Sequence, residues 1–262
     1  MPELPDVETV ARMLRRTVLG RRIRRVQVIT PSTIRSPAAT LFARRLRGRI
    51  VRRVGRRGKY LLVELDRGLT LLIHLRMTGD FAFVRRTVRV HPHTRVVFSF
   101  GAHELRFVDQ RRFGHMDLVP TVDLPAFEPL RRVGVEPLDR TFTQDLLHTL
   151  LHHRRGALKG FLLRQDLIAG LGNIYADEVL WQARLHPRRQ VNTLRPADAH
   201  RLHNTIRSVL KHAVRSLSRY GRPVGTLLDV REAGGLCPRD GHPLTIAPIA
   251  GRTTYFCSAC QK

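Results

Sequence analysis

The sequence predicts an α+β fold of several domains, in which a leading helix and a β-rich part precede a helical part and a short cysteine-bearing tail. The hydrophobic pattern has a helical period at the start, short alternating runs over residues 23–118, and a helical period again over 143–217. All three cysteines lie in the tail. We therefore expect domains over 1–120, 141–233 and 234–262, with a Pro-rich linker over 121–140.

The N-terminal part begins with a helix and continues with strands. A helix is expected over residues 4–19, where apolar side chains recur at helical spacing. Residues 66–68 and 101–103 are typical hairpin turns between strands. Several short strands joined by local turns favour an antiparallel sandwich or barrel. The expected strands include Val26–Ile29, Tyr60–Leu65, Leu69–Ile73 and Val96–Phe100.

The helical part has breaks near Gly156, Gly170–Asn173 and Pro187. At the second break, glycines precede Asn173 and a new helix. A turn of this kind directs backbone N–H groups and the helix N-terminus towards an anion, and Asn173 adds a side-chain donor. Because the chain carries a formal net charge of +26, we expect the anion to be a DNA phosphate. Gly-x-Gly turns are common and mostly structural, so this signal is weak when taken alone.

The charge balance predicts a polyanionic partner. The chain has 262 residues with 47 Lys and Arg against 21 Asp and Glu, giving a formal net charge of +26. A hydrophobic content of 42% is enough for a core and excludes a disordered basic tail. We find no apolar run long enough to span a membrane and no signal peptide, so we expect a cytoplasmic, nucleoid-associated protein that does not bind membranes.

The cysteine tail predicts a structural zinc site. Cys257 and Cys260 form a CxxC pair, and Cys237 and Asp240 have the same spacing. Two such turns are typical of a tetrahedral zinc site on a β-hairpin. The fourth ligand is Asp240, or His242 in its place. The alternative is a hairpin that has lost its metal and is held by packing; a disulfide is not expected in the cytosol.

The first residues predict amine chemistry. Removal of Met1 makes Pro2 the N-terminus, and its nitrogen is then a secondary amine beside the carboxyl group of Glu3. Schiff-base formation at the aldehyde carbon of a sugar requires at least a nucleophilic amine and an acid beside it. The alternative is a proline-rich helix start. Lys59 is a second candidate functional residue. Lysine is rare among the many arginines of this chain, so a retained lysine can indicate a need for a compact ammonium group. The alternative interpretation is a surface lysine at a strand edge.

Several motifs in order resemble one known family. They are Pro2–Pro5, Gly58–Tyr60, His74–Gly79, Asp109–Gly114, Gly170–Glu178 and the cysteine hairpin. The ordered set is similar to the formamidopyrimidine-DNA glycosylase family, which also includes endonuclease VIII, and covers essentially the whole chain. The resemblance implies a two-layer β-sandwich with a leading helix, a helix-two-turns-helix domain and a zinc-finger hairpin, with DNA in a cleft between two lobes.

The resemblance also implies roles for single residues. Pro2 resembles the nucleophile that attacks C1′ of the damaged nucleotide, Glu3 the acid that protonates the sugar ring oxygen, and Lys59 a lysine that binds phosphates. Other residues resemble side chains that enter the duplex when the damaged base is flipped out, or that contact phosphates. The alternative is that they are ordinary core residues or solvent-exposed arginines. This DNA-binding set comprises His74, Met77, Arg111, Arg112, Phe113, Asn173 and Arg252. For His74, a hydrogen-bonded sandwich histidine is the favoured alternative.

Three departures from the family pattern limit these expectations. Asp6 stands where the family usually has Glu, the segment 217–235 is shorter than usual, and Asp240 replaces a cysteine. We expect a monomeric bifunctional DNA glycosylase and AP lyase that removes oxidised purines, chiefly 8-oxoguanine and formamidopyrimidines, from double-stranded DNA. It would release the base through a Schiff base at Pro2 and then cut the strand by β,δ-elimination. The alternatives are an endonuclease VIII-like enzyme for oxidised pyrimidines, or a non-catalytic DNA-binding member of the family.

Overall fold

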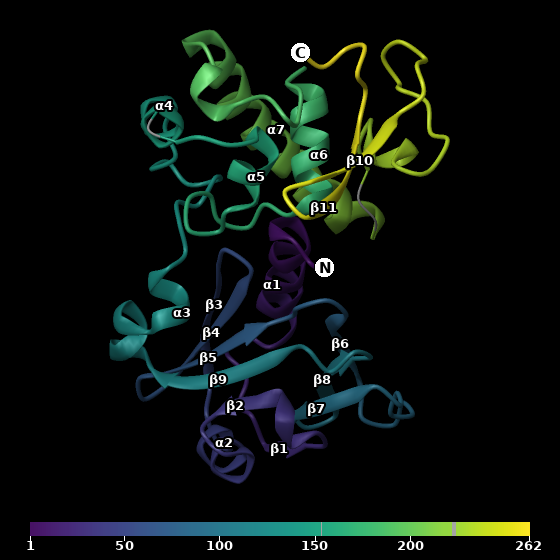
Figure 1. Cartoon of the computed structure of the whole chain (residues 1–262). Coiled ribbons are helices and arrows are strands. Elements are labelled where there is room, and N and C mark those ends of the chain that lie inside the picture. Colours follow the sequence, from purple (N-terminus) through teal and green to yellow (C-terminus); the bar gives the residue numbers. More distant parts are fainter. Residues whose placement is uncertain (153, 222–223) are drawn as a thin grey trace. The chain divides into compact units, whose positions relative to one another are not determined.

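The computed structural model describes residues 1–152, 154–221 and 224–262, and these form two compact units (Figure 1). The first unit comprises Met1–Pro2 and Asp6–Arg131, and the second comprises Glu3–Pro5 and Arg132–Lys262. Glu3 therefore belongs structurally to the second unit, although it follows Pro2 of the first. Each unit has a hydrophobic core of its own.

The first unit contains two β-sheets, as the sequence predicts. All strand pairs are antiparallel except β2 with β9, which is parallel. One sheet has the order β1 (Arg25–Val28), β7 (Thr94–Ser99), β8 (His103–Asp109) and β6 (Gly79–Arg85). The other has the order β2 (Ile34–Ser36), β9 (His115–Pro120), β5 (Leu69–His74), β4 (Tyr60–Leu65) and β3 (Val51–Arg57).

One core joins the two sheets into a sandwich. On β4, Leu61, Val63 and Leu65 are buried at every second position, which is the period of a strand with one face inward. They share a cluster with Phe98 and Phe107 of the other sheet. The sandwich expectation is therefore confirmed, and the barrel alternative is wrong.

Two helices belong to this N-terminal part of the chain. Helix α1 (Leu4–Thr17) ends two residues earlier than expected, and its Leu14 is fully buried. Helix α2 (Ala39–Leu46) was not expected, because a segment of eight residues within a β-rich stretch is too short to reveal a helical period. Phe42 and Leu46 anchor it in the sandwich core. The short turn η1 (Pro31–Thr33) precedes α2, and η2 (Thr121–Ala126) and α3 (Glu128–Arg131) lie within the expected linker.

The second unit is helical and ends in a β-hairpin. Its helices are α4 (Gln144–His152), α5 (Leu158–Leu163), α6 (Asn173–Gln182) and α7 (Pro196–Tyr220), with short turns η3 (Val191–Thr193) and η4 (Leu228–Val230). Strands β10 (Thr245–Ile249) and β11 (Arg252–Phe256) form the hairpin. The predicted breaks in the helical period are confirmed, since they separate α4, α5, α6 and α7.

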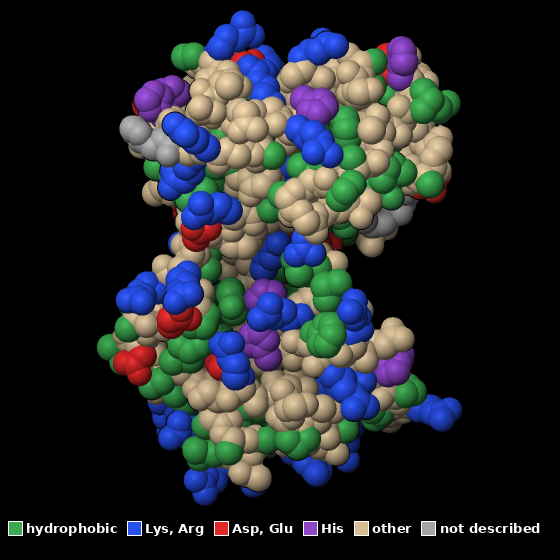
Figure 2. Space-filling view, viewed as in Figure 1, with side chains coloured by type: hydrophobic (Ala, Val, Ile, Leu, Met, Phe, Trp, Pro, Cys, Tyr) green, Lys and Arg blue, Asp and Glu red, His purple; other side chains and the backbone are tan. Residues whose placement is uncertain are grey.

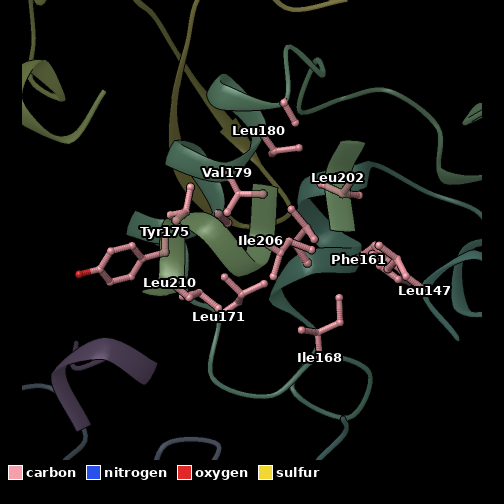
Figure 3. Packing of buried hydrophobic residues seen from close by; sticks show 14 of the residues in the cluster. Leu147, Phe161, Ile168, Leu171, Tyr175, Val179, Leu180, Leu202, Ile206 and Leu210 are labelled. Carbon is pink, nitrogen blue, oxygen red and sulfur yellow. The ribbon is translucent and has the colours of Figure 1, made fainter. Parts of the chain in front are cut away.

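Helix α6 lies at the centre of this unit. Figure 3 shows its Tyr175, Val179 and Leu180 packed with Ile206 and Leu210 of α7. Seven consecutive residues of α6, from Tyr175 to Trp181, are buried, so the helix is covered on every side. A helix buried in this way is a rigid support for the groups at its N-terminus. In the part of the chain that the structure describes, we find no helix with the length and apolarity needed to cross a membrane.

Candidate active site

The carboxylate of Glu3 is held by the N-terminus of α6. Its Oε2 accepts hydrogen bonds from the backbone N–H groups of Gly172 at 2.8 Å and Tyr175 at 3.2 Å, and Oε1 accepts from Ile174 at 2.9 Å. The side chain is 2% exposed. The first N–H groups of a helix have no partner within the helix and carry the positive end of its dipole. They therefore satisfy and stabilise the negative charge of this buried carboxylate.

The glycines of this turn make room for the N-terminal segment. A Cβ on Gly172 would lie 2.3 Å from Cδ of Glu3, and a Cβ on Gly170 would lie 2.6 Å from Cβ of Leu4. The backbone N–H of Leu4 also donates to the carbonyl of Gly170 at 2.9 Å. The expectation of a DNA phosphate at these backbone N–H groups is therefore wrong, because the anion they hold is the carboxylate of Glu3.

Asn173 is the first residue of α6, and its amide faces the hairpin. Its Nδ2 donates to the carbonyl of Thr253 at 3.0 Å, next to Arg252 at the start of β11. Arg252 is exposed. The structure thus places two of the predicted phosphate-binding residues on neighbouring parts of one unit.

Lys59 and His74 lie at the same end of neighbouring strands. Lys59 sits in the two-residue turn between β3 and β4, and it is only 7% exposed, so the interpretation as a surface lysine is wrong. His74 ends β5, and its Nδ1 accepts the backbone N–H of Arg76 at 3.0 Å. Burial, followed by the positive charge of Arg76, lowers the pKa of His74 to about 3. His74 is therefore a neutral imidazole whose proton is on Nε2.

The residues predicted to enter the duplex are exposed on two loops. Met77 is 40% exposed and Phe113 is 52% exposed, so the interpretation of both as core residues is wrong. Arg111 is also exposed, and its guanidinium lies 4.8 Å from the centre of the Phe113 ring. Arg112 between them is exposed and has a φ of 59°, in the left-handed region.

The hairpin brings four metal-binding groups together. The Sγ atoms of Cys237 and Cys260 lie 3.8 Å apart, and Oδ2 of Asp240 lies 3.3 Å from Sγ of Cys257. All four ligand atoms lie within 4.8 Å of one another. Tetrahedral zinc with Zn–S bonds of about 2.3 Å places sulfur atoms about 3.8 Å apart, and a sulfur and an oxygen roughly 3.5 Å apart. The spacing therefore fits a zinc ion.

Asp240 is the fourth group of this set, and His242 lies beside it. Nδ1 of His242 is 3.5 Å from Oδ1 of Asp240, outside the set of four. The pKa of Asp240 is lowered to about 2, first by its hydrogen bond with the Cys237 thiol. Arg239 donates to Sγ of Cys260 at 3.3 Å and stacks on the ring of Trp181 of α6. A guanidinium in this position would offset part of the negative charge that the cysteines carry when zinc is bound.

A buried ion cluster connects the hairpin to the helices, and sequence reasoning missed it. Nζ of Lys159 lies 2.6 Å from Oδ1 of Asp177, and both side chains are fully buried. Lys159 also donates to Oγ1 of Thr254 at 2.7 Å. Oδ2 of Asp177 accepts from Nη2 of Arg231 at 2.8 Å and from the backbone N–H of Tyr255 at 3.2 Å. The rarity of lysine, which drew attention to Lys59, also marks Lys159.

The charges of Lys159 and Asp177 are stabilised by each other. Burial lowers the pKa of Lys159 and raises the pKa of Asp177, and each charge opposes the shift of the other. The next residue, Glu178, is buried as well, and its Oε2 accepts the backbone N–H groups of Leu227 and Leu228 at 3.0 Å. Two consecutive acids of α6 thus fix the chain on both sides of η4. Arg222 and Pro223, in the segment 217–235 that the sequence predicts to be shortened, lie outside the described residues.

Family models match most of the chain. The formamidopyrimidine-DNA glycosylase N-terminal domain matches residues 1–116, and the H2TH domain of the same enzyme matches residues 133–220. The formamidopyrimidine-DNA glycosylase of Desulforamulus reducens is 41% identical over 275 residues, which cover 100% of this chain and 99% of the relative. The corresponding protein of Pelotomaculum thermopropionicum is 39% identical, with 100% and 99% covered.

This chain belongs to the formamidopyrimidine-DNA glycosylase family. Solved structures of a family member from Lactococcus lactis have the same fold. Its complex with DNA that contains an abasic site has a TM-score of 0.92 and 31% identity, with 99% of each chain covered. Its complex with DNA that contains N7-benzyl-Fapy-dG has a TM-score of 0.92 and 32% identity, with 100% of each chain covered.

The surface of this glycosylase family member is strongly basic. Figure 2 shows Lys and Arg side chains distributed over the visible surface of both units, with few Asp and Glu side chains between them. The excess of positive charge suits a nucleic-acid partner, because bound cations released from DNA drive association.

Proposed function

We propose that this protein is a bifunctional DNA glycosylase and AP lyase of base excision repair that removes oxidised purines through a Schiff base at Pro2. The carboxylate of Glu3, held by three backbone N–H groups of the buried helix α6, carries this proposal. These hydrogen bonds fix the carboxyl group of Glu3, the residue next to the Pro2 amine. Membership of the formamidopyrimidine-DNA glycosylase family supports the same reaction.

The reaction begins at the amine of Pro2 after removal of Met1. An α-amine has a reference pKa of roughly 7.7–8.0, so part of it is uncharged at neutral pH. The nitrogen forms a bond to C1′, and the bond from C1′ to the damaged base breaks. The base leaves with the bonding electron pair and takes up a proton from water. The carboxylate of Glu3 accepts the proton that the Pro2 nitrogen loses and returns it to the ring oxygen. The bond from C1′ to that oxygen then breaks, and a protonated imine forms.

The imine then allows strand cleavage. It draws electrons from C1′ and makes the proton on C2′ acidic, so removal of that proton expels the 3′ phosphate. A second elimination expels the 5′ phosphate, and both sides of the abasic site are cut. We assign the transfer of these protons to the carboxylate of Glu3, the residue next to Pro2.

We further propose that exposed side chains of the first unit replace the damaged base when it leaves the duplex. Extrusion of a base costs a few kcal/mol of stacking, which inserted side chains partly replace. Met77 and Phe113 are apolar and exposed, and Arg111, whose guanidinium lies 4.8 Å from the centre of the Phe113 ring, is the cation that suits an orphan cytosine. Phosphates around the lesion are bound by Lys59, His74, Arg112, Asn173 and Arg252.

The proposed lesions are 8-oxoguanine opposite cytosine and formamidopyrimidines. The L. lactis relative has been solved with Fapy-dG derivatives and also with DNA that contains an oxidised pyrimidine, so the endonuclease VIII-like alternative is the second candidate. Excision from an 8-oxoguanine duplex and from a thymine-glycol duplex separates them. Faster release of thymine glycol would reverse the choice.

The Pro2→Gly variant separates an enzyme from a non-catalytic DNA-binding member of the family. We expect it to lose base excision and imine formation while it still binds DNA. Unchanged excision by this variant would refute the proposed nucleophile.

We propose one structural zinc ion on the hairpin, held by Cys237, Asp240, Cys257 and Cys260. When bound, zinc cross-links the two turns of the hairpin through four closed coordination positions. Metal analysis of the purified protein tests this, with one equivalent of zinc expected. A zinc-free protein with a folded hairpin would favour the alternative in which packing alone holds it.

We expect this protein to act as a monomer on double-stranded DNA that contains oxidised bases or abasic sites, in the cytoplasm and with the nucleoid. Gel filtration with light scattering tests the monomer. A stable dimer would contradict it.

A further inference from the structure

The two loops that carry Met77 and Phe113 are joined through one buried carboxylate. Asp109, at the end of β8, is fully buried. Its Oδ1 accepts a short hydrogen bond from the hydroxyl of Thr78, which follows Met77 in the first loop. Its Oδ2 accepts the backbone N–H of Gly114 at 2.7 Å, which follows Phe113 in the second loop.

The hydroxyl of Thr78 links the first loop to Arg111 of the second loop. Its Oγ1 accepts the backbone N–H of Arg111 at 3.1 Å while it donates to Asp109. The second loop is therefore fixed at both ends, at Arg111 through Thr78 and at Gly114 directly. An alcohol can do both tasks at once because it is a donor and an acceptor.

The ring of Phe107 packs against the backbone of both loops. A Cβ on Gly79 would lie 2.9 Å from Cζ of Phe107, and a Cβ on Gly114 would lie 2.5 Å from the same atom. Phe107 is fully buried in the sandwich core. Glycine at both positions lets the two backbones approach the tip of this ring, Gly79 beside Cζ and Cε2 and Gly114 beside Cζ and Cε1.

The backbone of both loops is strained where the exposed side chains begin. Arg76, before Met77, has a φ of 57°, and Arg112, before Phe113, has a φ of 59°. Residues other than glycine keep this left-handed conformation only where their surroundings fix it. The hydrogen bonds of Asp109 and Thr78 and the packing on Phe107 are such surroundings.

We propose that Thr78 and Asp109 are positioning residues that lock Met77, Arg111 and Phe113 into one rigid wedge before DNA is bound. This inference rests on the proposed function, because it assigns the wedge to the opening of the duplex. A wedge ordered in advance loses little conformational entropy when it enters the base stack. Thr78 and Asp109 therefore govern extrusion of the lesion and have no part in the chemistry at Pro2.

The Thr78→Val variant tests the proposal, because valine keeps the shape and removes both hydrogen bonds of the hydroxyl. A duplex with 8-oxoguanine and a neighbouring 2-aminopurine reports unstacking by fluorescence, and single-turnover excision reports the overall rate. A single-stranded abasic oligonucleotide, trapped with borohydride, reports imine formation without any need to open a duplex.

We expect Thr78→Val to lower duplex excision at least about tenfold, as the loss of a hydrogen bond to a buried charge does, and to slow the fluorescence change equally. Trapping on the single strand stays within about twofold of the unsubstituted protein. Thr78→Ser restores duplex excision, and Asp109→Asn reproduces the defect. Thr70→Val is the matched control, since buried Thr70 bonds to Thr121 at 2.9 Å in the same unit, away from both loops.

Duplex excision by Thr78→Val equal to that of the unsubstituted protein would overturn the proposal. An equal loss on duplex and single strand would also overturn it, because the residue would then act on the chemistry or on folding. Absence of trapping by the unsubstituted protein on both DNAs would instead refute the proposed function and this inference with it.

Discussion

Two regions with exposed arginines at tight turns are held in different ways. The wedge loops of the first unit are fixed by a carboxylate, a hydroxyl and backbone N–H groups around Phe107. The hairpin of the second unit is held by the four metal-binding groups and also by the ion cluster of Lys159, Asp177 and Arg231. The supports of the wedge loops meet at Asp109, Thr78 and Phe107, whereas those of the hairpin lie in two separate places.

The difference explains how the hairpin tolerates Asp240. A carboxylate in place of a thiolate weakens one support of the hairpin, but the ion cluster and the bond from Asn173 to Thr253 remain. The supports of the wedge loops all involve Asp109, Thr78 or the ring of Phe107, so a change at one of these residues should affect both loops. The predictions below test this contrast.

The largest effect is expected from the ion cluster. Lys159→Met leaves Asp177 buried with one cation fewer, and the loss of one partner of a buried ion pair costs about 3–5 kcal/mol of unfolding free energy. Thermal or denaturant unfolding measures it. Lys211→Met on the exposed face of α7 is the matched control and should change stability little. Equal stability of the two variants would show that the metal site alone holds the hairpin.

Displacement of Glu3 should have the next largest effect. The Cβ that Gly172→Ala introduces lies 2.3 Å from Cδ of Glu3, so the carboxylate must leave its three donors. We expect excision to fall by about 100-fold, as it does when a catalytic group is misplaced by about 1 Å. Gly55→Ala, where a Cβ meets open space, is the control. Normal excision by Gly172→Ala would show that the position of Glu3 is not critical.

A moderate effect is expected at the metal site. Asp240→Cys restores a set of four thiolates, which bind zinc more tightly than three thiolates and a carboxylate, and zinc retention against a chelator should rise at least about tenfold. Asp240→Ala should release zinc faster than the unsubstituted protein while far-UV circular dichroism changes little. Identical retention by all three proteins would exclude Asp240 as a ligand.

The hairpin arginine should have a smaller effect. DNA affinity as a whole should fall roughly 10³-fold between about 50 and 200 mM salt if six or more phosphates are contacted. Arg252→Ala should lower affinity several-fold and reduce the slope of log affinity against log salt by about one. An unchanged slope would remove Arg252 from the set of phosphate contacts.

The smallest effect is expected from the charge state of His74. With a pKa of about 3 it stays neutral from pH 8 to pH 5, so it contributes no pH dependence to DNA affinity over that range. The unfolded chain binds a proton at this histidine near pH 6.5, and its stabilising contribution is therefore present above pH 6.5 and is lost as pH falls towards 3. The His74→Gln variant should lose this part of the pH dependence of stability. An NMR titration of His74 near pH 6.5 would contradict it.

Much of the fold could be predicted from the sequence, because periodicity records which face is buried. Tyr60–Leu65 was predicted with its observed bounds, and the breaks near Gly156 and Gly170 separate the helices as expected. Helix α2 could not be predicted, since its burial at Phe42 and Leu46 is set by packing against distant strands. The parallel pairing of β2 with β9 depends on tertiary contacts in the same way.

The candidate site could be predicted only where a residue type is chemically unusual. An N-terminal proline beside Glu3, a rare lysine at position 59 and the spaced cysteines drew attention for that reason. The helix N-terminus at Gly172 was predicted as an anion site, but the anion is Glu3, which lies 169 residues away in the chain. Asp109 and Asp177 lie within motifs of the resemblance, but their hydrogen-bond and ion-pair partners could not be predicted, because a single aspartate has no local pattern that reveals them.

The most direct test of the account is borohydride trapping on a duplex with 8-oxoguanine opposite cytosine, followed by peptide mapping of the adduct. The account predicts a cross-link at the N-terminal nitrogen of a peptide that begins at Pro2, which would establish Met1 removal, the nucleophile and the lyase step together. A cross-link on a lysine, or tight binding without any adduct on either this duplex or abasic DNA, would contradict it.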